Sequence, residues 1–193
     1  MGTEPFLAGL VLAAGAGTRF GGRKQLAEVD GRPMLEHALA AMQSALVEPV
    51  TVVLGADADE IREAVDMHGA EPIVCADWED GQSASLRTGV DALDRAGADA
   101  IVVTLGDQPH IAARAIDAVV AARAPGEADG VRATYDGEPG HPVLLERSLF
   151  GRIRALRGDT GARDVLRDAR VLDVPCDGIG DPADVDTPDD LLP

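Results

Sequence analysis

The sequence predicts an α/β fold, with a mostly parallel central sheet and helices on both of its faces. Apolar runs rich in β-branched residues alternate with alanine-rich helical patterns, which is typical of parallel sheets. Hydrophobic residues make up 46% of the chain and aromatic residues only 3%, which indicates a core of aliphatic side chains. The length of 193 residues suits one core, and we expect residues 1–193 to form a single domain.

The predicted elements follow in order along the chain. Strands are expected at residues 7–14, 50–54, 72–75, 100–105, 130–135 and 141–145, and helices at residues 33–46, 59–67, 83–95 and 111–122. Pro33 suits a first helical position, and Asp57 or Asp59 can cap the second helix. Residues 175–188 show little periodicity, so we expect them to cross the surface before a short terminal helix.

The charge of the chain excludes several classes of partner. It carries 34 acidic residues against 17 lysines and arginines, a net charge of −17. This field repels nucleic acids and anionic membranes, so we expect neither as a partner. No apolar run approaches a membrane span and no signal peptide pattern occurs, which predicts a cytoplasmic protein. Cys75 and Cys176 have no metal-binding spacing, so we expect both to be structural or incidental.

A glycine-rich loop at residues 15–24 ends in Lys24, the only lysine of the chain. Residues 15–32 hold four basic side chains against two acidic ones, so this part of an acidic protein is locally positive. Free backbone N–H groups, a following helix and converging cations are the components of an anion site. A lysine ammonium supplies a compact charge for phosphate oxygens. The loop therefore predicts phosphate binding, although its spacing matches neither the dinucleotide fingerprint nor the P-loop.

Two aspartates are candidates for a cation site. Asp107 follows the predicted strand at residues 100–105, where its carboxylate can meet Mg²⁺ that also contacts phosphate oxygens. A turn-forming role before Pro109 is the alternative. Asp186 is our choice for a second ligand, if residues 184–190 return to the same edge of the sheet. Either Asp184 or Asp186 can instead cap the last helix.

Small and hydroxyl-bearing residues open the helix predicted at residues 83–95. Gln82, Ser83 and Ser85 stand in a segment where a flat base can approach the backbone and find amide and hydroxyl partners. Gln82 or Ser83 can also simply cap the helix. The two interpretations are compatible.

Several segments, in this order, resemble the molybdenum cofactor cytidylyltransferase family. They are Leu-Ala-Ala-Gly at 12–15, Arg-Phe-Gly at 19–21 with Lys24, Gly-Gln-Ser at 81–83, Ser-Leu-Arg at 85–87, Leu-Gly-Asp-Gln-Pro at 105–109, Gly-His-Pro-Val at 140–143, Gly-Asp-Thr-Gly-Ala-Arg at 158–163 and Asp-Val-Asp-Thr-Pro at 184–188. The resemblance covers nearly the whole chain and implies a Rossmann-like nucleotidyltransferase fold. Related guanylyltransferases usually have glycine in place of Ala14, so this residue indicates cytidine transfer.

The resemblance implies a Mg²⁺-dependent transfer of CMP from CTP to the phosphate of molybdopterin or its metal-loaded form, with release of pyrophosphate. The product would serve a molybdenum hydroxylase client. The implied catalytic residues are Lys24, Arg19 and Asp107, and Asp107 and Asp186 would hold the metal. The implied nucleotide-binding residues are Leu12, Ala13, Ala14, Gly15, Gly17, Lys24, Gln82, Ser83 and Ser85.

The acceptor site and two other functions stay open. His141 and Arg163 are the candidates for acceptor binding, while the arginines of residues 151–170 form either a solvated helix face or a cradle for an anionic pterin. One alternative function uses GTP, or a sugar or alditol phosphate as acceptor. Another is a non-catalytic chaperone that delivers the cofactor. Lys24, Asp107 and Asp186 together argue against a pure carrier.

Overall fold

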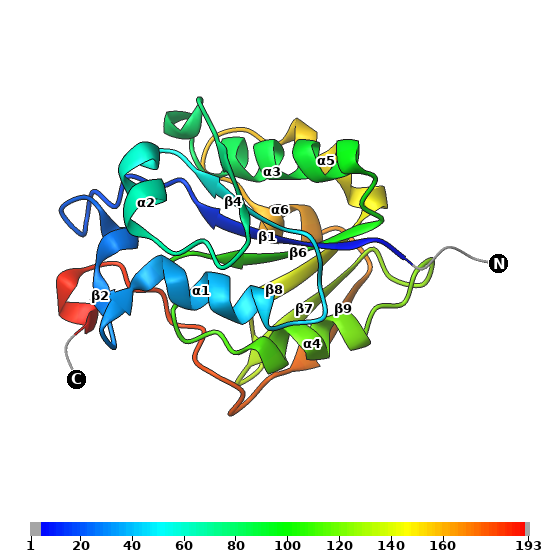
Figure 1. Ribbon diagram of the computed structural model, residues 1–193. Coiled ribbons are helices and arrows are strands. Elements are labelled where there is room, and N and C mark those ends of the chain that lie inside the picture. The colour runs from blue at the N-terminus through cyan, green and yellow to red at the C-terminus, as the bar shows by residue number, and fades with distance from the viewer. Residues whose placement is uncertain (1–4, 192–193) are drawn as a thin grey trace.

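The computed structural model describes residues 5–191, and its central feature is one seven-stranded sheet (Figure 1). The strands lie in the order β5-β4-β1-β6-β8-β7-β9. Their bounds are β1 Leu7–Ala13, β4 Val50–Leu54, β5 Glu71–Val74, β6 Ala100–Leu105, β7 Gly130–Tyr135, β8 Glu138–Glu146 and β9 Val171–Pro175. Within this sheet β8 alone runs against the other strands. The predicted mostly parallel sheet is therefore confirmed.

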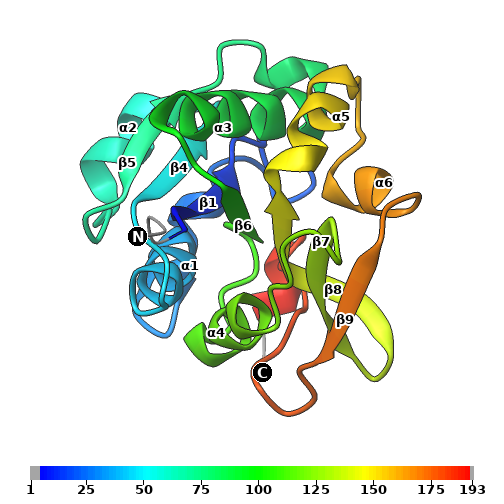
Figure 2. The same ribbon diagram turned by 90° about the vertical axis from the view of Figure 1, so that its right-hand side faces the viewer.

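Helices cover both faces of this sheet (Figure 2). Their bounds are α1 Met34–Gln43, α2 Ala58–Ala64, α3 Gln82–Ala96, α4 Ala113–Ala121, α5 Phe150–Ala155 and α6 Ala162–Leu166. Side chains of α1 and α4 belong to one buried cluster, and side chains of α3, α5 and α6 belong to the other. The sheet thus separates two aliphatic cores, as the composition predicts. None of the described helices combines the length and apolarity needed to cross a membrane.

Close packing between α3 and β1 helps to position the functional end of the sheet. Gly89 faces Leu10, and a Cβ atom at Gly89 would lie 2.5 Å from Leu10 Cδ1. The ends of β1 and β6 are also aligned, because the Gly106 amide donates a 2.9 Å hydrogen bond to the Leu12 carbonyl. The start of α3 and the loops after β1 and β6 consequently surround one region.

The helix predicted at residues 33–46 is present as α1 Met34–Gln43. It does not follow the glycine-rich loop directly. Lys24 instead opens the short 3-10 turn η1 Lys24–Leu26, and the hairpin of β2 Glu28–Val29 and β3 Arg32–Pro33 comes before α1. No α-helix N-terminus therefore adjoins the loop. Its backbone amides and basic side chains, rather than a helix dipole, would attract an anion.

The C-terminal half contains elements that the sequence did not predict. These are α5, α6 and the edge strand β9, which pairs in parallel with β7. The other edge of the sheet is β5, and the two edge strands contain Pro72 and Pro175.

After β9, residues 176–187 cross back to the carboxyl end of β6, and a 3-10 turn, η4 Pro188–Leu191, follows. The expected surface crossing and short terminal helix are both present. The Gln108 side chain holds this segment by donating a 2.8 Å hydrogen bond to the Pro182 carbonyl. The crossing segment therefore lies against the loop that contains Asp107.

Candidate active site

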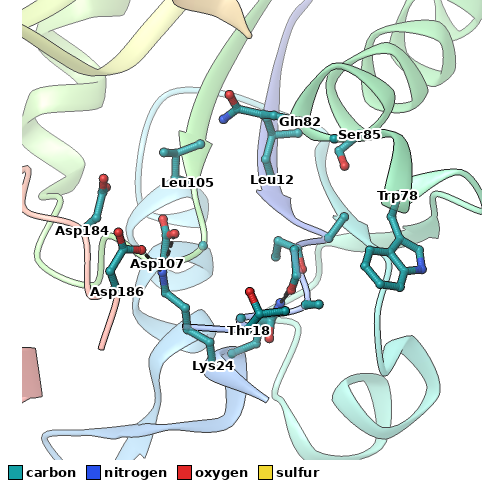
Figure 3. A pocket seen from close by; sticks show the side chains of 18 of the residues that line it. Leu12, Thr18, Lys24, Trp78, Gln82, Ser85, Leu105, Asp107, Asp184 and Asp186 are labelled. Atoms are coloured by element: carbon teal, nitrogen blue, oxygen red, sulfur yellow. Dashed lines mark hydrogen bonds and ion pairs between the residues drawn. The ribbon is translucent and has the colours of Figure 1, made fainter. Parts of the chain in front are cut away.

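A cavity of about 600 Å³ lies at the carboxyl ends of β1 and β6 (Figure 3). This is where open α/β sheets bind their ligands. Its lining consists of Leu12, Ala13, Ala14, Gly15, Ala16, Gly17, Thr18, Arg19, Lys24, Gln25, Trp78, Glu79, Gly81, Gln82, Ser85, Leu105, Gly106, Asp107, Asp159, Asp184 and Asp186. Main-chain groups, basic side chains and carboxylates thus line the same cavity, which suits a polar, charged ligand of nucleotide size.

Lys24 joins two carboxylates from distant parts of the chain. Its Nζ atom donates hydrogen bonds of 2.9 Å to Asp107 Oδ2 and 2.8 Å to Asp186 Oδ1. Although it is charged, Lys24 is only 8% exposed. Burial lowers its pKa, but the hydrogen bonds that Lys24 donates to Asp186 and Asp107, together with their charges, outweigh this effect and raise the pKa above its usual range. The lysine is therefore a stable ammonium in this cluster.

The two carboxylates differ in how their oxygens are used. Asp186 accepts from Lys24 on one oxygen and from Arg19 Nη1, at 3.0 Å, on the other. The hydrogen bond from Lys24 is the main cause of the lowered pKa of Asp186. In Asp107, Oδ1 is buried and has no hydrogen-bond partner. A buried oxygen without a donor is costly, so this atom is available to a ligand that arrives from the cavity.

A third carboxylate, Asp184, lines the cavity beside this cluster. Its Oδ1 atom accepts a 2.8 Å hydrogen bond from Gln108 Nε2. Burial and the nearby charge of Asp107 raise its pKa. In the sequence, Asp184 was a possible helix cap or second cation ligand, and we chose Asp186 as the ligand, although nothing in the local pattern distinguished Asp184 from its neighbours.

Gln25 and Gly17 hold the glycine-rich loop in its observed shape. The Gln25 amide donates 2.8 Å hydrogen bonds to the carbonyl oxygens of both Ala13 and Gly15. Gly17 has a φ of +59°, and a Cβ atom there would lie 2.8 Å from Lys24 Cβ. The absence of a side chain at Gly17 therefore lets the loop close over the stem of Lys24. The sequence analysis did not identify Gln25.

The opposite wall comes from the segment that leads into α3. Figure 3 shows Gln82, Ser85 and Trp78 on the far side of the cavity from Asp186. The side chain of Trp78 packs over Gly55, where an added Cβ would lie 2.6 Å from Trp78 Cβ. Trp78, the only tryptophan of the chain, was not predicted because an isolated aromatic residue carries no pattern.

A second segment, residues 156–161, packs against this wall and brings Asp159 to the cavity. Arg87 Nη1 donates a 2.6 Å hydrogen bond to the Leu156 carbonyl. Gly81 permits the contact, since a Cβ atom there would lie 2.7 Å from the backbone of Gly158. The sequence analysis identified the Gly-Asp-Thr-Gly-Ala-Arg segment by its family resemblance. Asp159 is the residue of this segment that lines the cavity.

Most of the predicted site residues line this cavity, but three do not. Ser83 is fully buried, and its hydroxyl accepts a 3.2 Å hydrogen bond from Arg87, so its side chain cannot reach a base in the cavity. His141 lies in β8 outside the lining, and burial lowers its pKa to about 4. Arg163 is exposed on α6 and is also outside the lining.

The carboxylates of Asp107 and Asp186 fit a partial site for a divalent cation. Among residues 5–191 there is no group of three or more His, Cys, Asp or Glu side chains arranged to hold a metal. Mg²⁺, however, is commonly bound by one or two carboxylates, with phosphate oxygens and water supplying its other ligands. Two observations meet this requirement. Asp107 Oδ1 has no hydrogen-bond partner, and Asp107 and Asp186 lie close enough together to share the Lys24 ammonium.

A model of the MobA-like NTP transferase domain matches residues 9–174 of the chain. The chain belongs to this family. It is 31% identical over 199 residues to the purine catabolism protein PucB of Bacillus subtilis, covering 97% of this chain and 95% of PucB. It is also 30% identical over 170 residues to the nicotine blue oxidoreductase of Paenarthrobacter nicotinovorans, covering 84% of this chain and 82% of that protein.

Solved structures agree with this assignment. Rv0371c of Mycobacterium tuberculosis superposes with a TM-score of 0.86 at 32% identity, over 98% of both chains. A structure of Rv0371c in complex with manganese superposes with a TM-score of 0.80 at 30% identity, over 96% of this chain and 95% of that one. Family and fold together make this protein an α/β nucleotidyltransferase of the MobA-like type.

Proposed function

We propose that the protein transfers CMP from CTP to the terminal phosphate of molybdopterin, or of its metal-loaded form, and releases pyrophosphate. The observation that carries the proposal is the meeting of Lys24, Asp107 and Asp186 at the wall of a nucleotide-sized cavity. The product would be used in the maturation of molybdenum hydroxylases. The choice of CTP rests on Ala14, which lines the cavity where related guanylyltransferases carry glycine.

The proposed reaction needs little acid–base chemistry. An oxygen of the acceptor phosphate attacks the α-phosphorus of CTP. The bond from that phosphorus to the oxygen bridging to the β-phosphate breaks, and pyrophosphate leaves with the electron pair. The acceptor is an anionic monoester, so no proton has to be removed from it. Two anions must instead be brought together in line, which calls for positioning and for positive charge in fixed places.

The residues of the cavity can be assigned to these tasks. The loop amides from Ala14 to Thr18, with Arg19 and Lys24, would bind the triphosphate and the departing pyrophosphate. Asp107 and Asp186 would hold Mg²⁺. When bound, Mg²⁺ supplies charge that neutralises phosphate oxygens. That a relative has been crystallised with manganese supports a divalent cation in this fold.

Gln82 and Ser85 would contact the base and sugar, because both line the wall opposite the carboxylates. Ser83 is left out of this assignment, since its hydroxyl is buried against Arg87. His141 and Arg163 lie outside the cavity lining, so the proposal gives neither of them a contact with the nucleotide.

The same site is compatible with a transferase that uses GTP, or that uses a sugar or alditol phosphate as acceptor. A carrier without catalytic activity fits less well. Such a carrier would have no use for a buried ammonium held between two carboxylates, because burying charge is unfavourable unless it is compensated. One relative is named nicotine blue oxidoreductase, which is a different class of enzyme from a transferase. The reaction of this protein therefore has to be assayed directly.

The decisive experiment incubates the protein with Mg²⁺, each of the four nucleoside triphosphates in turn, and molybdopterin. Mass spectrometry identifies the pterin product, and a coupled assay measures pyrophosphate. We expect a cytosine dinucleotide and one pyrophosphate for each product molecule, and no product without the acceptor. A guanine dinucleotide would overturn the choice of CTP. Absence of pyrophosphate with every nucleotide and a panel of phosphate acceptors would overturn the proposed transfer.

A further inference from the structure

The carboxylate oxygens that would bind a divalent cation are already engaged by side-chain cations. Lys24 donates to one oxygen of Asp107 and one of Asp186, and Arg19 donates to the second oxygen of Asp186. Asp107 Oδ1 is then the one oxygen of this pair that is left without a partner among the described residues. A cation that approaches Asp107 Oδ2 and Asp186 Oδ1 from the side of Lys24 would therefore compete with the ammonium for the same place.

We infer that the Lys24 ammonium occupies the divalent-cation position between Asp107 and Asp186, and that the cation enters by displacing this ammonium. The inference rests on the part of the proposed function that assigns a cation to these two carboxylates. It gives Lys24 two positions: the ammonium lies between the two carboxylates in the ligand-free protein, and it lies elsewhere in the cavity when cation and nucleotide are bound.

Distances favour exchange over simultaneous occupancy. The ammonium lies 2.9 and 2.8 Å from the two carboxylate oxygens, whereas Mg²⁺ binds oxygen at about 2.0–2.1 Å. A cation that binds the same two oxygens from the side of Lys24 would thus overlap the ammonium. Two positive charges this close in a partly buried site repel strongly.

The geometry of Lys24 limits where the displaced ammonium can go. Gly17 lies against the Cβ atom of Lys24, so the base of the side chain is held by the glycine-rich loop. The rest of the stem is flexible, and its free end faces the cavity. The ammonium would therefore swing within the cavity along the loop, which is where the proposed triphosphate lies.

Charge balance predicts that cation and nucleotide stabilise each other in the site. Without ligands, Asp107 and Asp186 are paired with Lys24 and Arg19, and Asp184 adds a third carboxylate beside this cluster. A divalent cation alone would leave the displaced Lys24 ammonium without a carboxylate partner. A cation that arrives with a triphosphate provides phosphate oxygens for that ammonium. Binding of the metal alone should consequently be weak, since the competent state is sparsely populated.

The single lysine allows the exchange to be observed directly. Protein labelled with ¹³C at the lysine Cε position gives one side-chain signal, from Lys24. We expect this signal to move during a Mg²⁺ titration, in step with metal occupancy measured by calorimetry. A signal that stays fixed while Mg²⁺ binds would show that ammonium and metal coexist, and the inference would be wrong.

A binding experiment with Mn²⁺ tests the same inference without relying on NMR. Lys24→Met removes the competing charge, so we expect Mn²⁺ to bind at least about tenfold more tightly than to the unchanged protein. Lys24→Arg keeps a cation and should bind Mn²⁺ weakly. Arg23→Met removes a neighbouring charge that pairs with Glu60, and should leave Mn²⁺ affinity unchanged.

The outcomes separate this inference from the proposed function. Equal Mn²⁺ affinity of Lys24→Met and the unchanged protein, or no binding by either, contradicts displacement. If Lys24→Met fails to fold, as judged by circular dichroism, the labelled-lysine titration of the unchanged protein decides alone. A protein that shows the exchange but transfers no nucleotide would overturn the proposed function and leave the inference intact.

Discussion

The Val185 amide donates a 2.9 Å hydrogen bond to the Asp107 carbonyl and so fixes the C-terminal crossing segment to the loop after β6. The next residue, Asp186, is thereby brought to the carboxylate of Asp107, with Lys24 between them. One backbone contact thus joins residues that are nearly 80 positions apart in the sequence, and the cation cluster depends on it.

Replacing Lys24 should abolish most of the transferase activity. For Lys24→Ala we expect kcat/KM to fall by the equivalent of about 2–4 kcal/mol, the range for single charged groups in preorganised sites. The measurement is steady-state pyrophosphate release from CTP. Arg23→Ala is the matched control, because Arg23 lies next to Lys24 and pairs with Glu60 outside the cavity lining. Unchanged turnover in Lys24→Ala would contradict the role given to the lysine.

Replacing Gln108 should loosen the C-terminal segment while leaving the sheet intact. Gln108→Ala removes the hydrogen bonds to the Pro182 carbonyl and to Asp184, at a cost of about 1–3 kcal/mol. We expect faster hydrogen exchange of the Val185 amide, with exchange in β1 unaffected. Equal exchange rates at Val185 in the two proteins would show that Gln108 does not hold this segment.

Adding a methyl group at Gly55 should displace Trp78. A Cβ atom at this position would lie 2.5 Å from the Ala14 carbonyl oxygen and 2.6 Å from Trp78 Cβ. We expect Gly55→Ala to cost about 1–3 kcal/mol of stability and to change the fluorescence spectrum of Trp78, the only tryptophan. Gly151→Ala is the control, because a Cβ there meets no atom within 4 Å. A neutral Gly55→Ala variant would argue against this packing.

Stability should decrease between pH 6.5 and pH 4 because of His141. Burial lowers its pKa to about 4 in the folded protein, while Asp107 opposes this shift. The unfolded chain takes up the proton near pH 6.5, so between these values it binds more protons than the folded chain. The contribution of His141 to the free energy of unfolding should therefore fall as pH falls through this window, and this contribution levels off below pH 4.

Urea denaturation at pH 7.5, 6 and 5 measures this effect, and His141→Gln provides the comparison. We expect the glutamine variant to lose less stability than the unchanged protein over this interval, by at most about 3 kcal/mol. Parallel curves for the two proteins would exclude His141 as the cause.

The sheet and the main loops were predictable because their signals are local. Buried runs such as Val50–Leu54 predict parallel strands, and the glycine-rich loop with its single lysine indicated an anion site. The inward position of Ser83 was also within reach of sequence analysis. Ser83, Leu86, Val90 and Leu93 are all buried in α3, at helical spacing, so the pattern places Ser83 on the core face.

Other features depend on tertiary contacts and leave no local trace. Strand β9 is short, half-exposed and contains Asp173, so it lacks the alternation of a predicted strand. The contact of Lys24 with both aspartates requires the neighbouring positions of β1 and β6, together with the return of the C-terminal segment. Residue spacing alone could not reveal that the lysine faces carboxylates before any phosphate is bound.

The two outer strands, β5 and β9, have a consequence for behaviour at high concentration. Exposed edges can recruit a strand from another molecule, and Val74 and Leu172, which are 49% and 41% exposed, would favour such pairing. Pro72 and Pro175 have no backbone N–H to offer, and Glu71 and Asp173 place charge on the same strands. Both edges thus resist edge-to-edge aggregation, and the sheet can end at each side without a partner.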